Sequence, residues 1–158
     1  MSDETRIETC GPIELIGVAL YGNPESDPSD RAWSLFGEVA DEASISRVGK
    51  DIYGLRIYPP GFPSKMQWSY MACLPKEPDT DVPIRMVAKT LPACKYAVQR
   101  AAGGVMGIDD AIVGLYREYI PNNGLQVAMP VDFEKYCNVT DHGKVPDVVE
   151  VWVPVKDA

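Results

Sequence analysis

The sequence has little of what most catalytic and metal sites require. It contains one histidine, His142, and four cysteines, none of which lies in a C-x-x-C pair. A zinc site has no ligand set here, and a Ser-His-Asp triad would depend on His142 without a nucleophile-elbow motif. The glycines of RAAGGVMG lack the spacing of a phosphate-binding loop. We therefore expect no metal site and no cofactor, and we expect His142 to lie in a polar loop.

Long apolar runs and an excess of basic residues are also missing. The first residues, MSDETRIETC, do not form a signal peptide, and no apolar stretch is long enough to cross a membrane. Lys and Arg number 15 against 23 Asp and Glu, a formal net charge of -8 that repels phosphate backbones and attracts cations. We expect a cytoplasmic protein with reduced cysteines that contacts neither nucleic acid nor membrane directly.

What is present suits a single folded domain, because 46% of the 158 residues are hydrophobic. Ser29 and Asp30 are good N-caps for a first helix. The patterns predict, in order, a strand at 13–21, a helix from about 29 to 43, strands at 51–58 and 67–74, a proline-rich linker at 75–83, strand candidates at 84–90 and 95–100, a helix at 108–120, an extended segment at 125–136 and a strand at 149–155.

This order of elements predicts an α+β domain made of two βαββ units, at about 7–75 and 84–156, within one domain over 1–158. The units would be related by pseudo-twofold symmetry, with an antiparallel sheet covered by two helices. Such an arrangement leaves a cleft where the two halves meet, and clefts of this kind are common ligand sites.

The closing strand, VEVWVPV, puts a carboxylate next to an aromatic ring on one face. Val149, Val151, Val153 and Val155 alternate with Glu150, Trp152 and Pro154. One interpretation is that Glu150 and Trp152 face solvent. The other is that both face the cleft, where a buried carboxylate needs a cation and a tryptophan face also favours one. Together they would suit a flat, positively charged aromatic ligand.

Three further aromatic groups are candidates for the cleft wall. Glu134 and Tyr136 share one face of FEKYCN, although an ordinary edge strand would show the same pattern. Trp68 and Tyr70 alternate in QWSY, where aromatic residues are more often core than binding site. Trp33 on the first helix is a core candidate that would line the cleft if the helix leans over it.

Several segments match a known family in order and spacing. KYAVQRAAG at 95–103 runs from a strand into a glycine, REYIPNNG closes the second helix, and FEKYCN precedes the VEVWVPV strand. Together they resemble the GyrI-like small-molecule-binding domain, the effector-binding domain of AraC- and MerR-type transcription regulators. IELIGVALYG and the helix with Trp33 fit its first half, so the resemblance covers about 7–156. Residues 100–102 and Val149 depart from the family's more polar residues at those places.

The resemblance implies a duplicated βαββ fold whose pocket has aromatic walls and an acidic residue that receives cationic, lipophilic compounds. Glu134 and Tyr136 fall on the family's E-x-Y motif, and Glu150 falls on the acidic position of its closing strand. That match favours the interpretation in which Glu150 faces the cleft. Because this domain accounts for the chain, we expect a stand-alone form without a helix-turn-helix.

Three functions stay open at this point. The first is multidrug binding of cationic aromatic small molecules by Glu150 or Glu134 and the surrounding aromatic residues. The second is hydrolysis of electrophilic small molecules, with Glu134 and Tyr136 as the catalytic pair. The third is a protein-interaction module, acting as a homodimer or on a regulatory protein partner, for which the sequence offers no interface signature.

Overall fold

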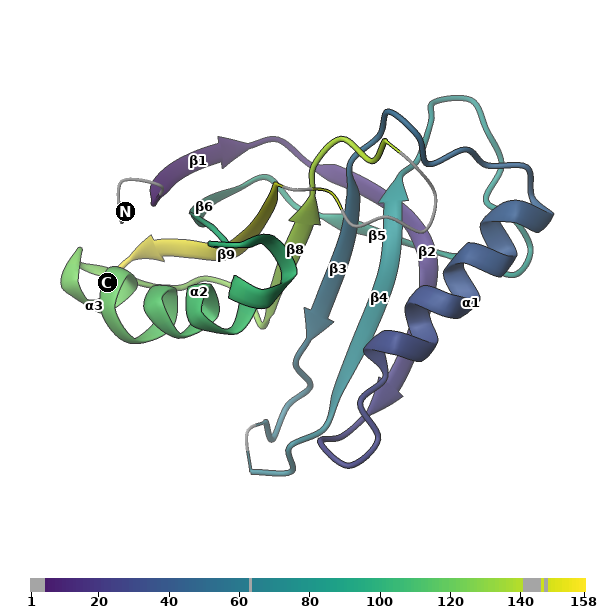
Figure 1. The fold of residues 1–158 in the computed structure, drawn as a ribbon. Helices are drawn as coiled ribbons and strands as arrows, with labels where there is room; N and C mark the ends of the chain where they lie inside the picture. Colours follow the sequence, from purple (N-terminus) through teal and green to yellow (C-terminus); the bar gives the residue numbers. More distant parts are fainter. Residues whose placement is uncertain (1–4, 63, 141–145, 147) are drawn as a thin grey trace.

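A computed structural model describes residues 5–62, 64–140, 146 and 148–158; His142 lies outside them. Within these residues the chain forms one nine-stranded antiparallel sheet with two helical segments (Figure 1). The first segment is residues 29–42, and the second is residues 104–122, which combine four short helical elements. The elements are β1 (Arg6–Cys10), β2 (Ile13–Gly22), α1 (Ser29–Glu42), β3 (Ile52–Ile57), β4 (Trp68–Pro75), β5 (Val87–Leu91), β6 (Cys94–Arg100), η2 (Gly104–Gly107), α2 (Ile108–Gly114), η3 (Leu115–Tyr119), α3 (Ile120–Asn122), β7 (Leu125–Val127), β8 (Val131–Tyr136) and β9 (Val149–Asp157).

The predicted α+β class and the order of the main elements are confirmed, with local differences. Strand β1 was missed, because its alternating polar residues give a weak apolar signal and it depends on pairing with β6. Strand β5 begins at Val87 rather than at residue 84. Ser29 is the first helical residue of α1 and caps nothing; its backbone N–H donates to Asp27 Oδ1 over 2.9 Å.

The strand order carries the two-unit pattern. The sheet runs β1-β6-β9-β8-β3-β4-β2-β5, and β7 pairs with β9. Reading outward from the centre, β3-β4-β2 on one side corresponds to β8-β9-β6 on the other. The second strand of each unit therefore meets its counterpart at β3–β8, and the pseudo-twofold axis passes between these two strands.

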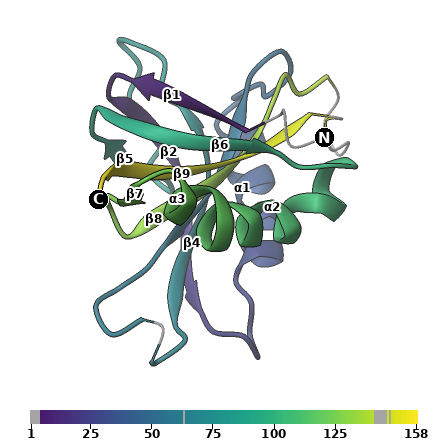
Figure 2. The same ribbon diagram turned by 90° about the vertical axis from the view of Figure 1, so that its left-hand side faces the viewer.

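Both helical segments pack on the same face of the sheet, which we call the helix face. Helix α1 buries Phe36, Val39 and Ala40 against β2 and β4, while Leu115 on the second segment packs with Val151 of β9. Figure 1 shows the two segments set apart along the sheet, with β3 and β8 between them, and in the view of Figure 2 the second segment lies in front of α1. None of the helices in the described ranges is long and apolar enough to span a bilayer.

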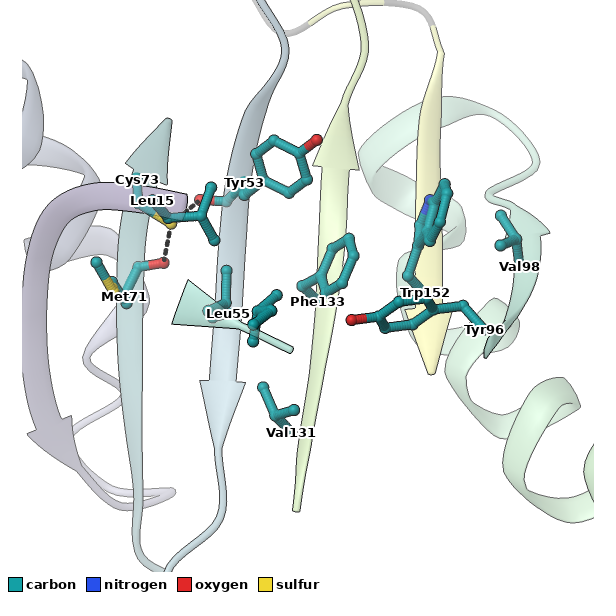
Figure 3. Packing of buried hydrophobic residues seen from close by; sticks show 11 residues of the cluster. Leu15, Tyr53, Leu55, Met71, Cys73, Tyr96, Val98, Val131, Phe133 and Trp152 are labelled. Carbon is teal, nitrogen blue, oxygen red and sulfur yellow. Dashed lines mark hydrogen bonds between the residues drawn. The ribbon is translucent and has the colours of Figure 1, made fainter. Parts of the chain in front are cut away.

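The opposite face holds a separate apolar core. Trp152 stacks on Phe133 with ring centroids 5.5 Å apart, and Tyr96 meets both rings edge-on (Figure 3). This core is enclosed because β1 and β2 follow one another in the chain and pair with β6 and β5 respectively, so that this ribbon links the two ends of the sheet. We call it the opposite-face core; Leu15 and Leu91 from the far end of the sheet belong to it.

Candidate functional site

The centre of the helix face carries polar side chains from both βαββ units. In the register of the sheet, Gly54 of β3 lies opposite Glu134 of β8, and Arg56 lies opposite Asp132. On its other side Arg56 lies opposite Tyr70 of β4. Residues directly opposite one another share a face, so these side chains gather where the two units meet, between α1 and α2.

Glu134 is the first centre of this cluster. Its residue is 3% exposed, and its Oε2 accepts a hydrogen bond of 2.5 Å from Arg56 Nη1. Its Oε1 accepts from the hydroxyl of Tyr70 and, over 3.3 Å, from that of Tyr136. Trp33 of α1 donates its Nε1–H to the Tyr70 oxygen over 2.8 Å. A chain of hydrogen bonds thus joins α1 to the carboxylate at the centre of the sheet.

Gly54 makes room for this arrangement. A Cβ atom added at Gly54 would lie 2.5 Å from Glu134 Oε1 and closer still to the Tyr70 hydroxyl. The missing side chain is what allows Tyr70 on β4 to reach across β3 to the carboxylate on β8.

Asp132 is the second centre and is fully buried. Arg56 Nε donates to its Oδ1 over 2.6 Å, and the hydroxyls of Tyr58 and Tyr116 both donate to its Oδ2 over 2.7 Å. Tyr116 lies on the π-helical turn Leu115–Tyr119, a rare helix form that occurs often at functional sites. The second helical segment is thereby connected to the cluster as α1 is through Trp33.

The cluster carries more negative than positive charge. Asp132 and Glu134 have a formal charge of -2, and Arg56 supplies +1. Burial alone would lower the pKa of Arg56, yet that pKa is raised because Glu134 and Asp132 both stabilise the cation. Burial, and then the neighbouring carboxylate, raises the pKa of each of the four tyrosines that donate to the cluster, so they stay protonated donors: Tyr58, Tyr70, Tyr116 and Tyr136.

Aromatic and apolar side chains close one end of the cluster. The ring of Trp33 meets that of Tyr136 edge-on, with centroids 5.3 Å apart. Ala101, Tyr136 and Val149 form a buried cluster, and Trp33 from α1 and Ile108 from α2 pack against it. Ala101 also borders a cavity of about 590 Å³, lined by residues 100–106 and Pro146. This volume falls within the range usual for small-molecule pockets.

Of the seven residues predicted to line the cleft, the structure brings four together. Glu134, Tyr136, Tyr70 and Trp33 form the connected cluster described above. Trp68 shares the helix face of β4 with Tyr70 but packs at the edge of the α1 core.

Glu150 and Trp152 lie on the other side of the sheet, so they do not share a face with Glu134 and Tyr136 as the prediction required. Trp152 belongs to the opposite-face core, and its Nε1–H donates to Glu150 Oε1 over 3.1 Å. Arg6 of β1 forms an ion pair of 2.9 Å with Glu150 Oε2. The helix face of β9 is occupied by its valines, which pack with Ala111 and Leu115, and strand alternation then directs Glu150 away from the helices.

The sequence reasoning also missed residues that complete the cluster. Arg56 was the available signal, since a lone arginine inside the apolar stretch IYGLRI needs a partner if it is buried. The strand pattern of VDFEKY likewise puts Asp132 on the same face as Glu134. Tyr58 and Tyr116 carried no signal, because only the fold brings β3 and the second helical segment to the same carboxylate.

Comparison with known proteins agrees with this architecture. A family model described as the GyrI-like small molecule binding domain matches residues 3–156. The chain belongs to the GyrI-like family. It is 25% identical over 124 residues to the transcriptional regulator BrlR of Pseudomonas aeruginosa, a match that covers 78% of this chain and 44% of that regulator. The chain thus spans less than half the length of the curated relative that it matches.

Solved structures share the fold of this GyrI-like domain. The structure of SAV2435 bound to tetraphenylphosphonium superposes with a TM-score of 0.73 at 19% identity, covering 97% of this chain and 94% of that one. An integron cassette protein from the mobile metagenome of Vibrio cholerae gives a TM-score of 0.71 at 17% identity, with coverage of 98% and 97%. A hydrolase from Listeria innocua gives 0.58 at 13% identity, with coverage of 97% and 92%.

Proposed function

We propose that this GyrI-like domain binds cationic, lipophilic aromatic small molecules on the helix face of β3 and β8, with Glu134 as the carboxylate that attracts the cation. The observation that carries the proposal is the burial of Glu134 between the two helical segments, with Tyr70, Tyr136 and Trp33 joined to it. We also include Trp68, a partly buried residue that packs against the α1 core, among the aromatic residues of the site.

Electrostatics supports a cation as the ligand. The formal charge of Arg56, Asp132 and Glu134 together is -1, so one carboxylate charge in this buried cluster has no counterion among the described residues. A cation that enters would offset this charge where little water screens it. Aromatic ring faces attract cations as well, and the net charge of -8 over the whole chain favours their approach.

The comparisons support the same ligand class. SAV2435, which has the same fold, was solved with tetraphenylphosphonium, a lipophilic aromatic cation. BrlR, which is similar to 78% of this chain, is a transcriptional regulator, so our proposal includes a role as the effector-binding part of such a protein. The free state of Cys10, Cys73, Cys94 and Cys137 is consistent with the reducing cytoplasm.

Two ions of the same shape and opposite charge test the proposal. Isothermal titration with tetraphenylphosphonium should give binding heat, whereas tetraphenylborate should give none, because the cluster disfavours a second anion. Glu134→Gln should weaken tetraphenylphosphonium at least about tenfold, the equivalent of about 1.4 kcal/mol. Glu150→Gln is the matched control, since Glu150 is also buried and ion-paired but lies on the opposite face.

The contrast between the two ions needs only the wild-type protein, so it does not depend on the folding of either variant. Equal binding of the phosphonium and the borate would show that charge does not select the ligand. Equal losses in Glu134→Gln and Glu150→Gln would show that Glu134 has no particular role.

A second candidate function, hydrolysis of electrophilic small molecules, is favoured by one contact. Tyr136 and Tyr70 both donate to the same oxygen of Glu134, so a proton donor and a carboxylate lie side by side in a buried site. Incubation with an epoxide-bearing aromatic probe, followed by mass spectrometry, should then give the hydrated product. Turnover should be lost in Glu134→Gln and in Tyr136→Phe. Recovery of the intact probe after long incubation would count against this function.

A further inference from the structure

In the cluster every carboxylate oxygen is hydrogen-bonded, whereas one nitrogen donor of Arg56 has no partner in the described part of the chain. Each of the four carboxylate oxygens of Asp132 and Glu134 already accepts at least one hydrogen bond. Asp132 Oδ2 and Glu134 Oε1 accept two each, so a ligand donor that reached either of these two oxygens would have to displace a tyrosine. No carboxylate oxygen of the site is therefore left without a hydrogen bond before a ligand arrives.

The donors are not all used. Arg56 directs Nε to Asp132 and Nη1 to Glu134, and its Nη2 is buried without a hydrogen-bond partner. Among the described residues only one other buried side-chain atom lacks a partner, the hydroxyl oxygen of Tyr96, and that residue belongs to the opposite-face core. A buried N–H group without an acceptor is costly, more so on a charged group. Within the described ranges, Arg56 Nη2 is thus the one buried polar side-chain atom of the helix face without a partner, and it needs a hydrogen-bond acceptor.

We propose that the ligand carries, beside its cationic and aromatic parts, a neutral hydrogen-bond acceptor such as a ketone or amide oxygen, which takes a hydrogen bond from Arg56 Nη2. This inference rests on the function proposed above and narrows its ligand class. A carboxylate or phosphate would also accept, but the formal charge of -1 on the cluster opposes a second anion. A neutral carbonyl meets the demand of Nη2 without that repulsion.

Such a hydrogen bond would give selectivity. A site with a buried donor rejects an analogue that lacks the matching acceptor, because the donor then stays unpaired in the complex. Arg56 would thus have two roles, since it holds Asp132 and Glu134 in place and presents its third nitrogen to the ligand.

A pair of phosphonium probes separates this inference from the parent proposal. The probes are (4-oxopentyl)triphenylphosphonium and pentyltriphenylphosphonium, which share the cation and the three rings and differ in one ketone oxygen. The pentyl probe is the more lipophilic, so burial of apolar area alone would favour it. We expect titration calorimetry to show the oxopentyl probe binding about tenfold tighter, as one hydrogen bond to a charged group allows.

The matched variant is Arg56→Met with Asp132→Asn, which removes one charge of each sign and keeps the formal charge at -1. It should lose the preference for the oxopentyl probe and bind the pentyl probe as tightly or more tightly, because only the burial of apolar area then distinguishes the two. A second measurement avoids the variant: in wild-type protein with ¹⁵N-labelled arginine, an Nη–H resonance assigned to Arg56 should shift with the oxopentyl probe and not with the pentyl probe.

The outcomes differ for the two proposals. If both probes bind wild type equally, or the pentyl probe binds tighter, the acceptor inference is overturned and the cation-binding function stands. If neither probe nor tetraphenylphosphonium binds, the parent function fails and the acceptor inference fails with it. A preference for the oxopentyl probe that persists in the double variant would assign the acceptor contact to another residue and would also overturn it.

Discussion

Removal of Arg56 should destabilise the fold far more than removal of an exposed arginine. Arg56 is the one cation in contact with the buried carboxylates of Asp132 and Glu134 among the described residues. In Arg56→Met both carboxylates would stay buried without it, and breaking a buried pair on one side costs about 3–5 kcal/mol. In a chain of this length that corresponds to a fall in Tm on the order of 10 °C.

The control for size and charge is Arg85→Met. Arg85 forms its closer ion pair with Glu42 over 3.0 Å, and the two side chains are 45% and 57% exposed. Exposed pairs of this kind contribute about 0–1 kcal/mol. Urea unfolding followed by far-ultraviolet circular dichroism would give the free energy of unfolding for wild type and for both variants.

A double-mutant cycle isolates the buried pair. Asp132→Asn added to Arg56→Met removes one of the two unpaired charges, so the double variant should be more stable than Arg56→Met alone. The coupling free energy should reach at least about 2 kcal/mol, as for other contacting pairs in one network. If the two substitutions were additive, or if Arg56→Met cost no more than Arg85→Met, the electrostatic account of this cluster would be refuted.

Three further predictions concern the packing, hydrogen bonding and ionisation of buried residues. Gly54→Ala should lower the free energy of unfolding by about 1–3 kcal/mol through overpacking. Gly37→Ala in helix α1, where an added Cβ meets nothing within 4 Å, should raise it by up to about 1 kcal/mol. Chemical denaturation measures both changes, and two changes of the same sign would contradict the packing around Gly54. Trp33→Phe keeps a ring and removes the donor to Tyr70, so Tm should fall by an amount equivalent to about 1 kcal/mol, and an unchanged Tm would mean that this hydrogen bond adds nothing to stability. Burial raises the pKa of Tyr96 to about 12 and is the largest cause of the raised pKa of five other tyrosines, Tyr53, Tyr58, Tyr70, Tyr116 and Tyr136. Because the unfolded chain loses these protons first, the free energy of unfolding should fall as the pH rises from about 10, the unfolded pKa, through the folded values. The absorbance of folded protein at 295 nm and pH 11 should increase on adding denaturant, and full tyrosinate absorbance before unfolding would contradict the burial of these six tyrosines.

Much of the fold could be predicted from local patterns. The apolar runs of β2 and β3, the alternation in β4 and the helical spacing of α1 were sufficient to place these elements, whereas β7 and β8 were predicted only as one extended segment at 125–136. The edge strand β1 was not predicted, because five residues of mixed polarity become a strand only when β6 supplies their hydrogen bonds. The pairing of β1–β2 with β6 and β5, which encloses the opposite-face core, joins segments about 80 residues apart and leaves no local signature.

The candidate site was predictable in part. The spacing of Glu134 and Tyr136 required both side chains to share a face, and the family resemblance drew attention to them. The ion pairs of Arg56 with Asp132 and Glu134 connect positions 76 and 78 residues apart, so no local pattern shows them. Once the strand register is known, Gly54 and Arg56 on one strand face Glu134 and Asp132 on the next.

The residue pattern of β9 shows which of its side chains share a face, since side chains alternate along any strand. The pattern does not show which of those faces the second helical segment covers, because Val149 to Val155 are buried on both faces and hydrophobicity then gives no direction. In the folded protein this segment packs on the valines. That packing leaves Glu150 on the opposite face, where it is paired with Arg6. Glu134, which is paired with Arg56, is therefore the carboxylate at the centre of the helix face.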